Sequence, residues 1–431
     1  MAVLERLNDL IWGFPMLVLL MGTHIYFTIK LHFPQKNLIY ALKLSLGKTD
    51  NEGRNLSPFS ALATTLAATL GTGNIIGVST AVALGGPGAI FWCWITGILG
   101  MATAYSECYL SVLFRAQNSD GTYVGGPMYV LKNGLHNRNL GSLYAVCTLM
   151  AAFGVGCTTQ ANSVTQAASA SFHLSPHLVG IALSILTGIV IIGGVRSIAN
   201  LCERTVPAIS FFYLLGCALL LILYHRVLPS ACLLILKDAF SFGSVAGGVA
   251  GATLQHAVRY GVARGLFTNE AGIGTSAIAA AASHATEPRT QAYVSMTAVF
   301  WDTVVMCLIT GLVIVSNMLY DPASVAGIAE TGLTAAAFNH LPYVGDAFLT
   351  ISLAAFAITT LIGWSYFGEK ATEYLMGQKG IPFYKLAYIL MIYLGAIIPM
   401  RLVWESTDLI NAMMVLPNVL ALYCLRRQIK A

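Results

Sequence analysis

Long runs of apolar residues, separated by short clusters of proline, glycine and charged residues, make up most of the chain. Two of these runs, 180–194 and 209–224, contain no Asp, Glu, Lys or Arg. A helix needs about 20 such residues to cross the hydrocarbon core of a bilayer. The pattern therefore predicts an all-α polytopic membrane protein with eleven transmembrane helices, at residues 11–30, 57–83, 88–115, 142–171, 177–195, 204–225, 244–282, 290–318, 343–376, 383–400 and 404–426.

The composition agrees with this prediction. Of the 431 residues, 57% are hydrophobic and only 10% are charged, which is too few charges to cover a soluble surface of that size. The nine cysteines lack the close spacing of a metal cluster or a disulfide framework. The formal net charge of +5 comes from dispersed residues, so we expect the lipid bilayer, and not nucleic acid, as the anionic partner. Glu5 and Asp9 precede the first apolar run without a small-residue cleavage site, which predicts a retained helix.

Lysine and arginine are distributed unequally between the two sides of this topology. Most lie in the loops after spans one, three, five, seven and nine and in the C-terminal tail. The opposite side has only Arg6, Arg226, Lys237 and Arg401. Because cytoplasmic loops are enriched in Lys and Arg, we expect a protein of the cell membrane with its N-terminus outside and its C-terminus in the cytoplasm.

The second span contains the sequence TLGTGNIIG at 69–77, which places three glycines and an asparagine in an apolar helix. Each interior glycine costs a helix about 1 kcal/mol relative to alanine. The amide of Asn74 also needs a hydrogen-bonding partner at bilayer depth. The segment is therefore predicted to unwind locally and to expose backbone groups that can bind a ligand.

A second interruption lies five spans later, in the sequence FTNEAGIGTS that starts at Phe267. Here Thr268, Asn269 and Glu270 precede a Gly-x-Gly, and a glutamate facing lipid would be costly. Close helix packing also uses small residues, but it does not require the polar neighbours. Two broken helices at corresponding positions predict a secondary transporter with two inverted five-helix repeats, 57–225 and 244–426, preceded by one extra helix at 11–30, all in a single domain, 1–431.

These two segments resemble a known family. The sequences GTGNIIGVSTAVALGGPGAIFWCW at 71–94 and TNEAGIGTSAIAAAA at 268–282 are similar to signature blocks of the sodium:alanine symporters, the alanine/glycine:cation symporter family of the amino acid-polyamine-organocation superfamily. The resemblance implies a LeuT-like fold with one additional N-terminal helix. It also implies sodium-driven uptake of small neutral amino acids, chiefly alanine or glycine.

The resemblance further implies where the ligands bind. The substrate carboxylate is expected at the first break, on Gly71, Thr72, Gly73 and Asn74. Phe267 would be a pocket wall and Thr268 a polar ligand in the second break, which also contains Gly272 and Gly274. A sodium ion is expected between the first break and the ninth span, bound by Ala67, Leu70, Phe356, Thr359 and Thr360. The alternative for both threonines is a hydrogen bond to their own helix, which is common in membranes.

Other polar residues inside the spans have two interpretations each. Asn162 and Gln166 share one helix face and could bind the substrate or join two helices, whereas Gln160 points elsewhere. Trp364 could roof the pocket or be an ordinary interfacial tryptophan.

Three acidic residues also lie at depth. For Glu107 we prefer pairing with an arginine, namely Arg115, Arg259 or Arg264, whereas Asp302 has a better claim to the site. Glu270 matches no ligand of the related folds, so its role stays open.

The sequence thus predicts a monomeric symporter that works by alternating access, with a small neutral amino acid and a co-transported sodium ion as partners. Proton coupling through Glu270 or Asp302 is the first alternative, and an ion channel is a less favoured one. An enzyme is not expected, because neither HExxH nor GxSxG occurs.

Overall fold

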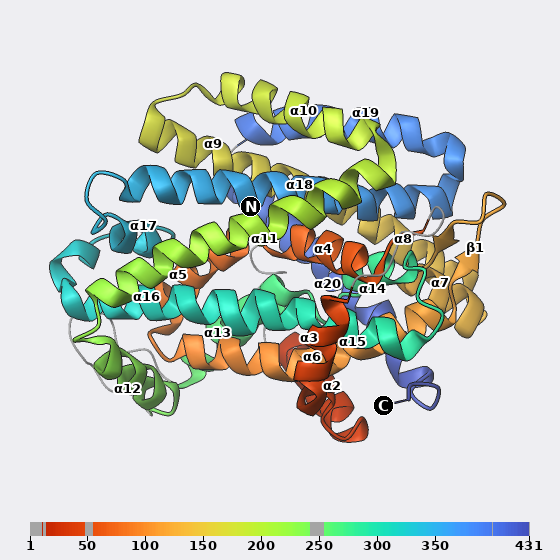
Figure 1. Ribbon diagram of the computed structural model, residues 1–431, viewed down its shortest axis with the longest axis horizontal. Coiled ribbons are helices and arrows are strands. Elements are labelled where there is room, and N and C mark those ends of the chain that lie inside the picture. Colours follow the sequence, from red (N-terminus) through yellow and green to blue (C-terminus); the bar gives the residue numbers. More distant parts are fainter. Residues whose placement is uncertain (1–10, 12–13, 48–54, 242–253, 399, 431) are drawn as a thin grey trace.

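The computed structural model describes residues 11, 14–47, 55–241, 254–398 and 400–430. Positions 12–13 of the expected first helix and 244–253 of the expected seventh lie outside the described residues. The described chain is a bundle of helices, most of which run roughly along its long axis (Figure 1). Its one sheet is a hairpin of β1 (Ala116–Gln117) and β2 (Tyr123–Val124), which pair antiparallel.

The α-helices carry the labels of Figure 1. Their bounds are α2 Phe14–Lys30, α3 Leu38–Ser45, α4 Pro58–Thr69, α5 Ile76–Gly85, α6 Ala89–Leu113, α7 Pro127–Tyr129, α8 Arg138–Phe153, α9 Thr159–Phe172, α10 Pro176–Ile192, α11 Gly194–Leu223, α12 Leu228–Ala239, α13 Leu254–Asn269, α14 Thr275–Ala281, α15 Pro288–Val299, α16 Leu308–Tyr320, α17 Leu333–Phe338, α18 Gly345–Met376, α19 Ile381–Ile397 and α20 Met400–Cys424.

Helix occurs in each of the eleven predicted segments. By length and apolar composition, six described helices can cross a membrane, or up to eight if each of two bent pairs counts as one span. One bent pair is the predicted first break, where 58–69 and 72–85 meet at 60°. The chain is therefore a multi-pass helical membrane protein with at least one broken span.

Two of the long helices contain π-helical turns that the sequence did not indicate. Gly154–Thr158 joins α8 to α9, and Phe300–Cys307 joins α15 to α16. Such turns are uncommon inside helices and often occur at functional sites. Both lie beside the broken segments described below.

Local sequence explains where the broken helices begin. Ser57 caps α4 by accepting a hydrogen bond from the amide of Ser60, and Pro58 occupies the first helical position, where no amide is needed. The backbone of Leu56 pairs with α14's far end, donating to the carbonyl of Ala282 (3.0 Å) and accepting from the amide of His284 (2.8 Å). This parallel bridge between Leu56 and Ser283 joins the start of α4 to the end of α14.

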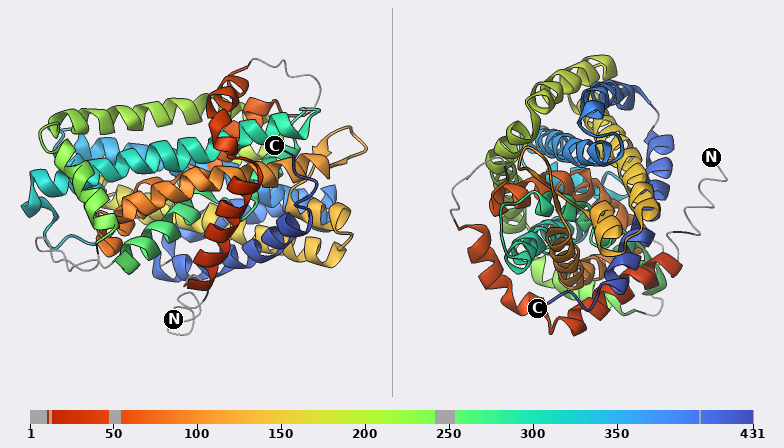
Figure 2. Two further views of the ribbon diagram at one scale, coloured as in Figure 1. Left: turned by 90° about the horizontal axis from the view of Figure 1, so that it is seen from below. Right: turned by 90° about the vertical axis from the view of Figure 1, so that its right-hand side faces the viewer.

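Packing places the broken helices in the interior. The helix α6 packs against α13, α14 and α15, while α18 packs against α4, α8, α9 and α11. The pair α10 and α19 lies at one edge of the bundle (Figure 1), and α2 crosses the outside of the bundle against α6 (Figure 2). The two breaks are thus enclosed by helices and not by lipid, which is where irregular backbone is tolerated in a membrane.

Candidate functional site

The first break lies between α4 and α5. Leu70 has an extended conformation (φ −73°, ψ 94°) and so does Gly71 (φ −143°, ψ −152°), after which a single 3₁₀ turn, Thr72–Asn74, leads into α5. The predicted unwinding of this segment is confirmed. The first amides of a helical turn have no carbonyl within the turn to bind, so the break presents backbone donors inside the bundle.

Asn74 holds this break in shape. Its Oδ1 accepts a hydrogen bond from the amide of Gly71 (3.0 Å). Its Nδ2 donates to Asp302 in the π-helical turn Phe300–Cys307, both to Oδ1 (2.8 Å) and to the backbone carbonyl (3.2 Å). Asp302 is completely buried, and its other oxygen accepts from the hydroxyl of Thr303 (2.7 Å). The carboxyl that the sequence placed near the site therefore acts on the first break through Asn74.

The second break lies between α13 and α14, as the sequence predicted. The chain takes positive φ angles at Glu270 (54°), Gly272 (97°) and Gly274 (94°). Glycine suits such angles because it has no Cβ. Glu270 is buried, and its carboxylate accepts a hydrogen bond from the hydroxyl of Thr275 at the start of α14. The glutamate thus stabilises the turn between α13 and α14, in which it lies.

Glu107 of α6 and Asn418 of α20 grip the second break, and we call this pair the Glu107–Asn418 clamp. Glu107 Oε1 accepts from the amide of Gly272 (2.8 Å) and from Nδ2 of Asn418 (2.6 Å). Asn418 Nδ2 also donates to the carbonyl of Gly272 (2.9 Å). Glu107 was expected to pair with Arg115, Arg259 or Arg264, but within the described residues its hydrogen bonds come from Gly272 and Asn418. Arg115 donates instead to the carbonyls of Ser283 (2.6 Å) and Ala285 (3.0 Å).

The two breaks touch each other. A Cβ placed on Gly73 would lie 3.4 Å from Oγ1 of Thr268, which itself donates to the carbonyl of Arg264 (2.8 Å). Phe267, the expected pocket wall, is half-buried and packs against the main hydrophobic core. Gly73 therefore permits a contact between segments that are nearly 200 residues apart in sequence.

The helix α18 brings its two threonines to the first break in different ways. Thr360 Oγ1 donates to the carbonyl of Leu70 (3.1 Å) and would lie 2.7 Å from a Cβ on Gly71. Thr359 Oγ1 bonds the carbonyl of Phe356 (2.8 Å) in its own helix. Hydrogen bonding within the helix, the alternative for both residues, therefore describes Thr359 but not Thr360. Ala67 is buried one turn before the break.

Gln160 of α9 also reaches the first break, although the sequence did not select it. Its Oε1 would lie 3.4 Å from a Cβ on Gly71, and this buried oxygen has no hydrogen-bond partner within the described residues. Gln160 could have been identified only by choosing the correct face of α9.

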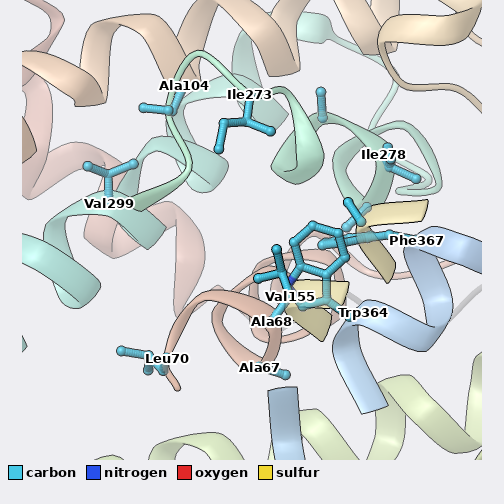
Figure 3. Close-up of a cluster of buried hydrophobic side chains, with 14 of the residues drawn as sticks. Ala67, Ala68, Leu70, Ala104, Val155, Ile273, Ile278, Val299, Trp364 and Phe367 are labelled. Atoms are coloured by element: carbon cyan, nitrogen blue, oxygen red, sulfur yellow. The ribbon is translucent and has the colours of Figure 1, made fainter. Parts of the chain in front are cut away.

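Trp364 is buried against the π-helical turn Gly154–Thr158, where a Cβ on Gly156 would lie 2.2 Å from the Cβ of the tryptophan. Figure 3 shows its ring beside Val155 and Ala68.

Asn162 and Gln166 lie on a different face of α9. Asn162 Nδ2 donates to the carbonyls of Gly395 (3.1 Å) and Ile398 (2.5 Å) at the end of α19, and its Oδ1 accepts from Gln166 (3.0 Å). These bonds favour the interpretation in which Asn162 joins two helices. Gln166 lines a cavity of about 260 Å³ next to the first break.

Comparisons with known proteins agree with this arrangement. The profile of the sodium:alanine symporter family matches residues 1–431. The sodium/alanine symporter AgcS of Methanococcus maripaludis is 42% identical, over 98% of this chain and 94% of that protein. An uncharacterised transporter of Haemophilus influenzae is 41% identical, over 99% of this chain and 94% of that protein. A solved structure, the substrate-bound outward-open state of a Na⁺-coupled sialic acid symporter, has the same fold (TM-score 0.61, 12% identity, 96% of this chain and 88% of that chain).

Proposed function

The chain belongs to the sodium:alanine symporter family, and from that premise we propose that it imports small neutral amino acids, alanine or glycine, together with sodium by alternating access. It is a membrane transporter, like the sodium/alanine symporter AgcS, and not an enzyme. The observation that carries the proposal is the contact between two broken helices at Gly73 and Thr268. A substrate site between two such breaks is the arrangement of many secondary transporters.

The substrate carboxylate would bind at the first break. The amides of Thr72 and Gly73 open the 3₁₀ turn, and the positive end of a helical turn favours an anion. The unpartnered Oε1 of Gln160 faces the same break from α9 and can accept a hydrogen bond from the substrate's ammonium group. Phe267 and Trp364 would narrow the pocket, which supports a small substrate. We keep Asn74, Gly272 and Gly274 in the site as residues that shape the two breaks.

The sodium ion would bind where α18 meets the first break. The hydroxyl of Thr360 already donates a hydrogen bond to the carbonyl of Leu70. If the hydroxyl turned its proton away, a cation between the two groups would bind both oxygens. Carbonyls of Ala67 and Phe356 and the hydroxyl of Thr359 complete the proposed set. Because the ion and the carboxylate would use adjacent residues of one segment, binding of either one orders the backbone that the other needs.

Replacing Thr360 by valine is expected to raise the sodium concentration for half-maximal uptake about tenfold. The change removes one oxygen and keeps the shape of the side chain, and a hydrogen bond or ligand contact to a charged group contributes about 1.5–3 kcal/mol. Thr372→Val is the matched control, since its hydroxyl bonds only the carbonyl of Gly368 in the same helix. Equal sodium dependence in both variants would remove Thr360 from the ion site.

The two halves of the chain would form inverted five-helix repeats, 57–225 and 244–426, within eleven spans. The two breaks support this proposal, because one lies between α4 and α5 and the other between α13 and α14, at corresponding positions of the two halves. We propose that the N-terminus lies outside and the C-terminus in the cytoplasm. Rocking of the repeats would then expose the site to each side in turn.

The direct test is uptake of radiolabelled alanine into proteoliposomes that contain the purified protein. An inward sodium gradient is expected to drive accumulation, because each sodium ion that enters down 100 mV contributes about 2.3 kcal/mol, equivalent to roughly 50-fold. Competition by glycine and serine ranks the substrates. Uptake that is unchanged when potassium replaces sodium on both sides would overturn sodium coupling. Unchanged sodium dependence in Glu270→Gln would count against the proton-coupled alternative.

A further inference from the structure

A cavity of about 260 Å³ lies directly beyond the first break. Ile75 and Ile76, the residues that follow the 3₁₀ turn, form part of its wall. The rest comes from α9, Thr331, α17 and the first turns of α18. A single water occupies about 30 Å³ of liquid volume, so the cavity has room for a small solute with some of its hydration water. Nothing in the proposed transport site accounts for this space.

One face of α9 connects the cavity to the first break. Gln160 lies at the break, Ser163 follows one turn later, and Ala167 and Ser171 follow at the spacing of successive turns. Ser163, Ala167 and Ser171 all line the cavity. The stripe from Gln160 to Ser171 covers about 16 Å of helix at 1.5 Å per residue. The cavity and the first break therefore lie at two successive positions along the same face of α9.

Asp346 gives the cavity its charge. Among the described residues that line it, Asp346 is the only ionisable one, and Lys and Arg are absent from its wall. One carboxylate oxygen accepts from the hydroxyl of Ser171 (3.0 Å), which also lies 2.8 Å from the hydroxyl of Thr350. This network joins α9 to α18 at the end of the cavity farthest along the stripe from Gln160, and it orients the carboxylate.

The rest of the wall suits a small amino acid. Leu349 and Leu353 supply an apolar surface, while the hydroxyl of Thr331 and the exposed amide of Gln166 supply hydrogen-bonding groups. Gln166 uses its nitrogen to bond Asn162, and its oxygen has no partner within the described part of the chain. An ammonium group can therefore meet both a carboxylate and a free amide oxygen here, next to an apolar patch for a methyl group.

We propose that this cavity is a vestibular subsite, at which the ammonium group of the incoming amino acid binds Asp346 before the substrate moves along α9 to the first break. The inference rests on the proposed function and on the proposed topology, in which the loops before α10 and α18 face outside. The subsite raises the local substrate concentration at the entrance, as a charged cleft does for an oppositely charged group. Substrate leaves it when Gln160 and the first break take over the amino and carboxylate groups.

The test is the kinetics of alanine uptake by Asp346→Asn at saturating sodium. Asparagine keeps an acceptor for Ser171, and position 346 is exposed, so the variant is expected to fold. The KM for alanine is expected to rise about fivefold with an unchanged maximal rate. Asp346→Glu is expected to restore the wild-type KM. The matched control is Asp321→Asn, which removes the same charge from the loop that precedes α17, where Asp321 pairs with His340 (3.3 Å) outside the cavity wall.

A second readout separates a binding role from a structural one. Asp346 lies in the first turn of α18, where an acid also stabilises a helix. Added choline chloride at constant sodium screens a charge interaction, so it is expected to raise the alanine KM of the wild type and to leave that of Asp346→Asn unchanged. Equal salt effects in both proteins, or a loss of maximal rate without a change in KM, would overturn the subsite.

The same measurements distinguish sodium from alanine as the ligand of Asp346, and failure of the subsite from failure of the proposed function. If Asp346→Asn raises the sodium concentration for half-maximal uptake and leaves the alanine KM unchanged, the carboxylate attracts the ion and the proposal is overturned. Sodium-independent uptake by the wild type would overturn the proposed function itself. A sodium-driven wild type with an unaffected Asp346→Asn variant would overturn the subsite alone.

Discussion

Asn74→Ala is expected to reduce alanine uptake by at least 100-fold while the protein still inserts into the membrane. The substitution leaves the amide of Gly71 and a carboxylate oxygen of the completely buried Asp302 without their partner. Each buried group that loses its hydrogen bond costs about 1–3 kcal/mol, and both costs fall on the first break. Uptake and binding of labelled alanine by purified protein, with the amount of folded protein measured by gel filtration, check the result.

A conservative change on the next helix is the control for Asn74. Thr80 lies on α5, and its hydroxyl bonds only the carbonyl of Ile76 in the same helix (3.0 Å). Because such a bond contributes little, Thr80→Ala is expected to transport at close to the wild-type rate. Normal uptake by Asn74→Ala would show that the break does not depend on this bridge, and would count heavily against the proposed site.

Glu107→Ala is expected to abolish transport and to lower stability, whereas Glu107→Gln retains most of both. The carboxylate oxygen Oε1 serves two buried donors, the amide of Gly272 and Nδ2 of Asn418. Glutamine still offers an oxygen at that position, but alanine leaves both donors unsatisfied at about 1–3 kcal/mol each. Thermal unfolding in detergent and uptake in proteoliposomes measure the two effects.

A double-mutant cycle tests whether the clamp acts as one unit. Asn418→Ala is expected to resemble Glu107→Ala, and the double variant is expected to lose little more than either single one, because residues of one network are not additive. Fully additive losses of stability would show that the two residues act independently. Transport by Glu107→Ala at the wild-type rate would show that the second break does not need the clamp.

The positions of the helices and of the two breaks could be predicted from sequence because both depend on local chemistry. Apolar runs of sufficient length favour helices in a bilayer, and the glycines at 71 and 73 and at 272 and 274 weaken the helix wherever it packs. The positive φ angles at Gly272 and Gly274 are the same preference seen in the folded chain. The sequence also assigned Asp302 a better claim to the site than Glu107, for which it favoured pairing with an arginine. Asp302 does bind Asn74 at the first break, whereas Glu107 binds the amide of Gly272.

Glu107 shows why the partners of buried polar groups were harder to predict. The nearest cation in sequence, Arg115, is only eight residues away, just beyond the end of α6, yet Glu107 binds a backbone amide 165 residues distant. A buried carboxylate needs hydrogen bonds from whichever donors the packing brings to it, and an exposed loop amide in a broken helix is such a donor. Sequence proximity carries no information about that choice.

The two faces of α9 illustrate the same limit. Helical periodicity correctly separated Gln160 from Asn162 and Gln166. It did not indicate which face looks toward the breaks, because amides occur on both faces. The structure turns Asn162 toward the carbonyls of α19 and Gln160 toward Gly71.

The sequence by itself thus determined the class of protein, the family, the helical segments and the two places where helices break, since each depends on residue types within one short window. Only the tertiary structure decided which groups meet at those breaks: Thr360 with Leu70, Asn74 with Asp302, and the Glu107–Asn418 clamp with Gly272. The physical reason is that a buried hydrogen bond depends on distance and direction to a fraction of an ångström. Those are set by the packing of whole helices and not by the identity of their neighbours in the chain.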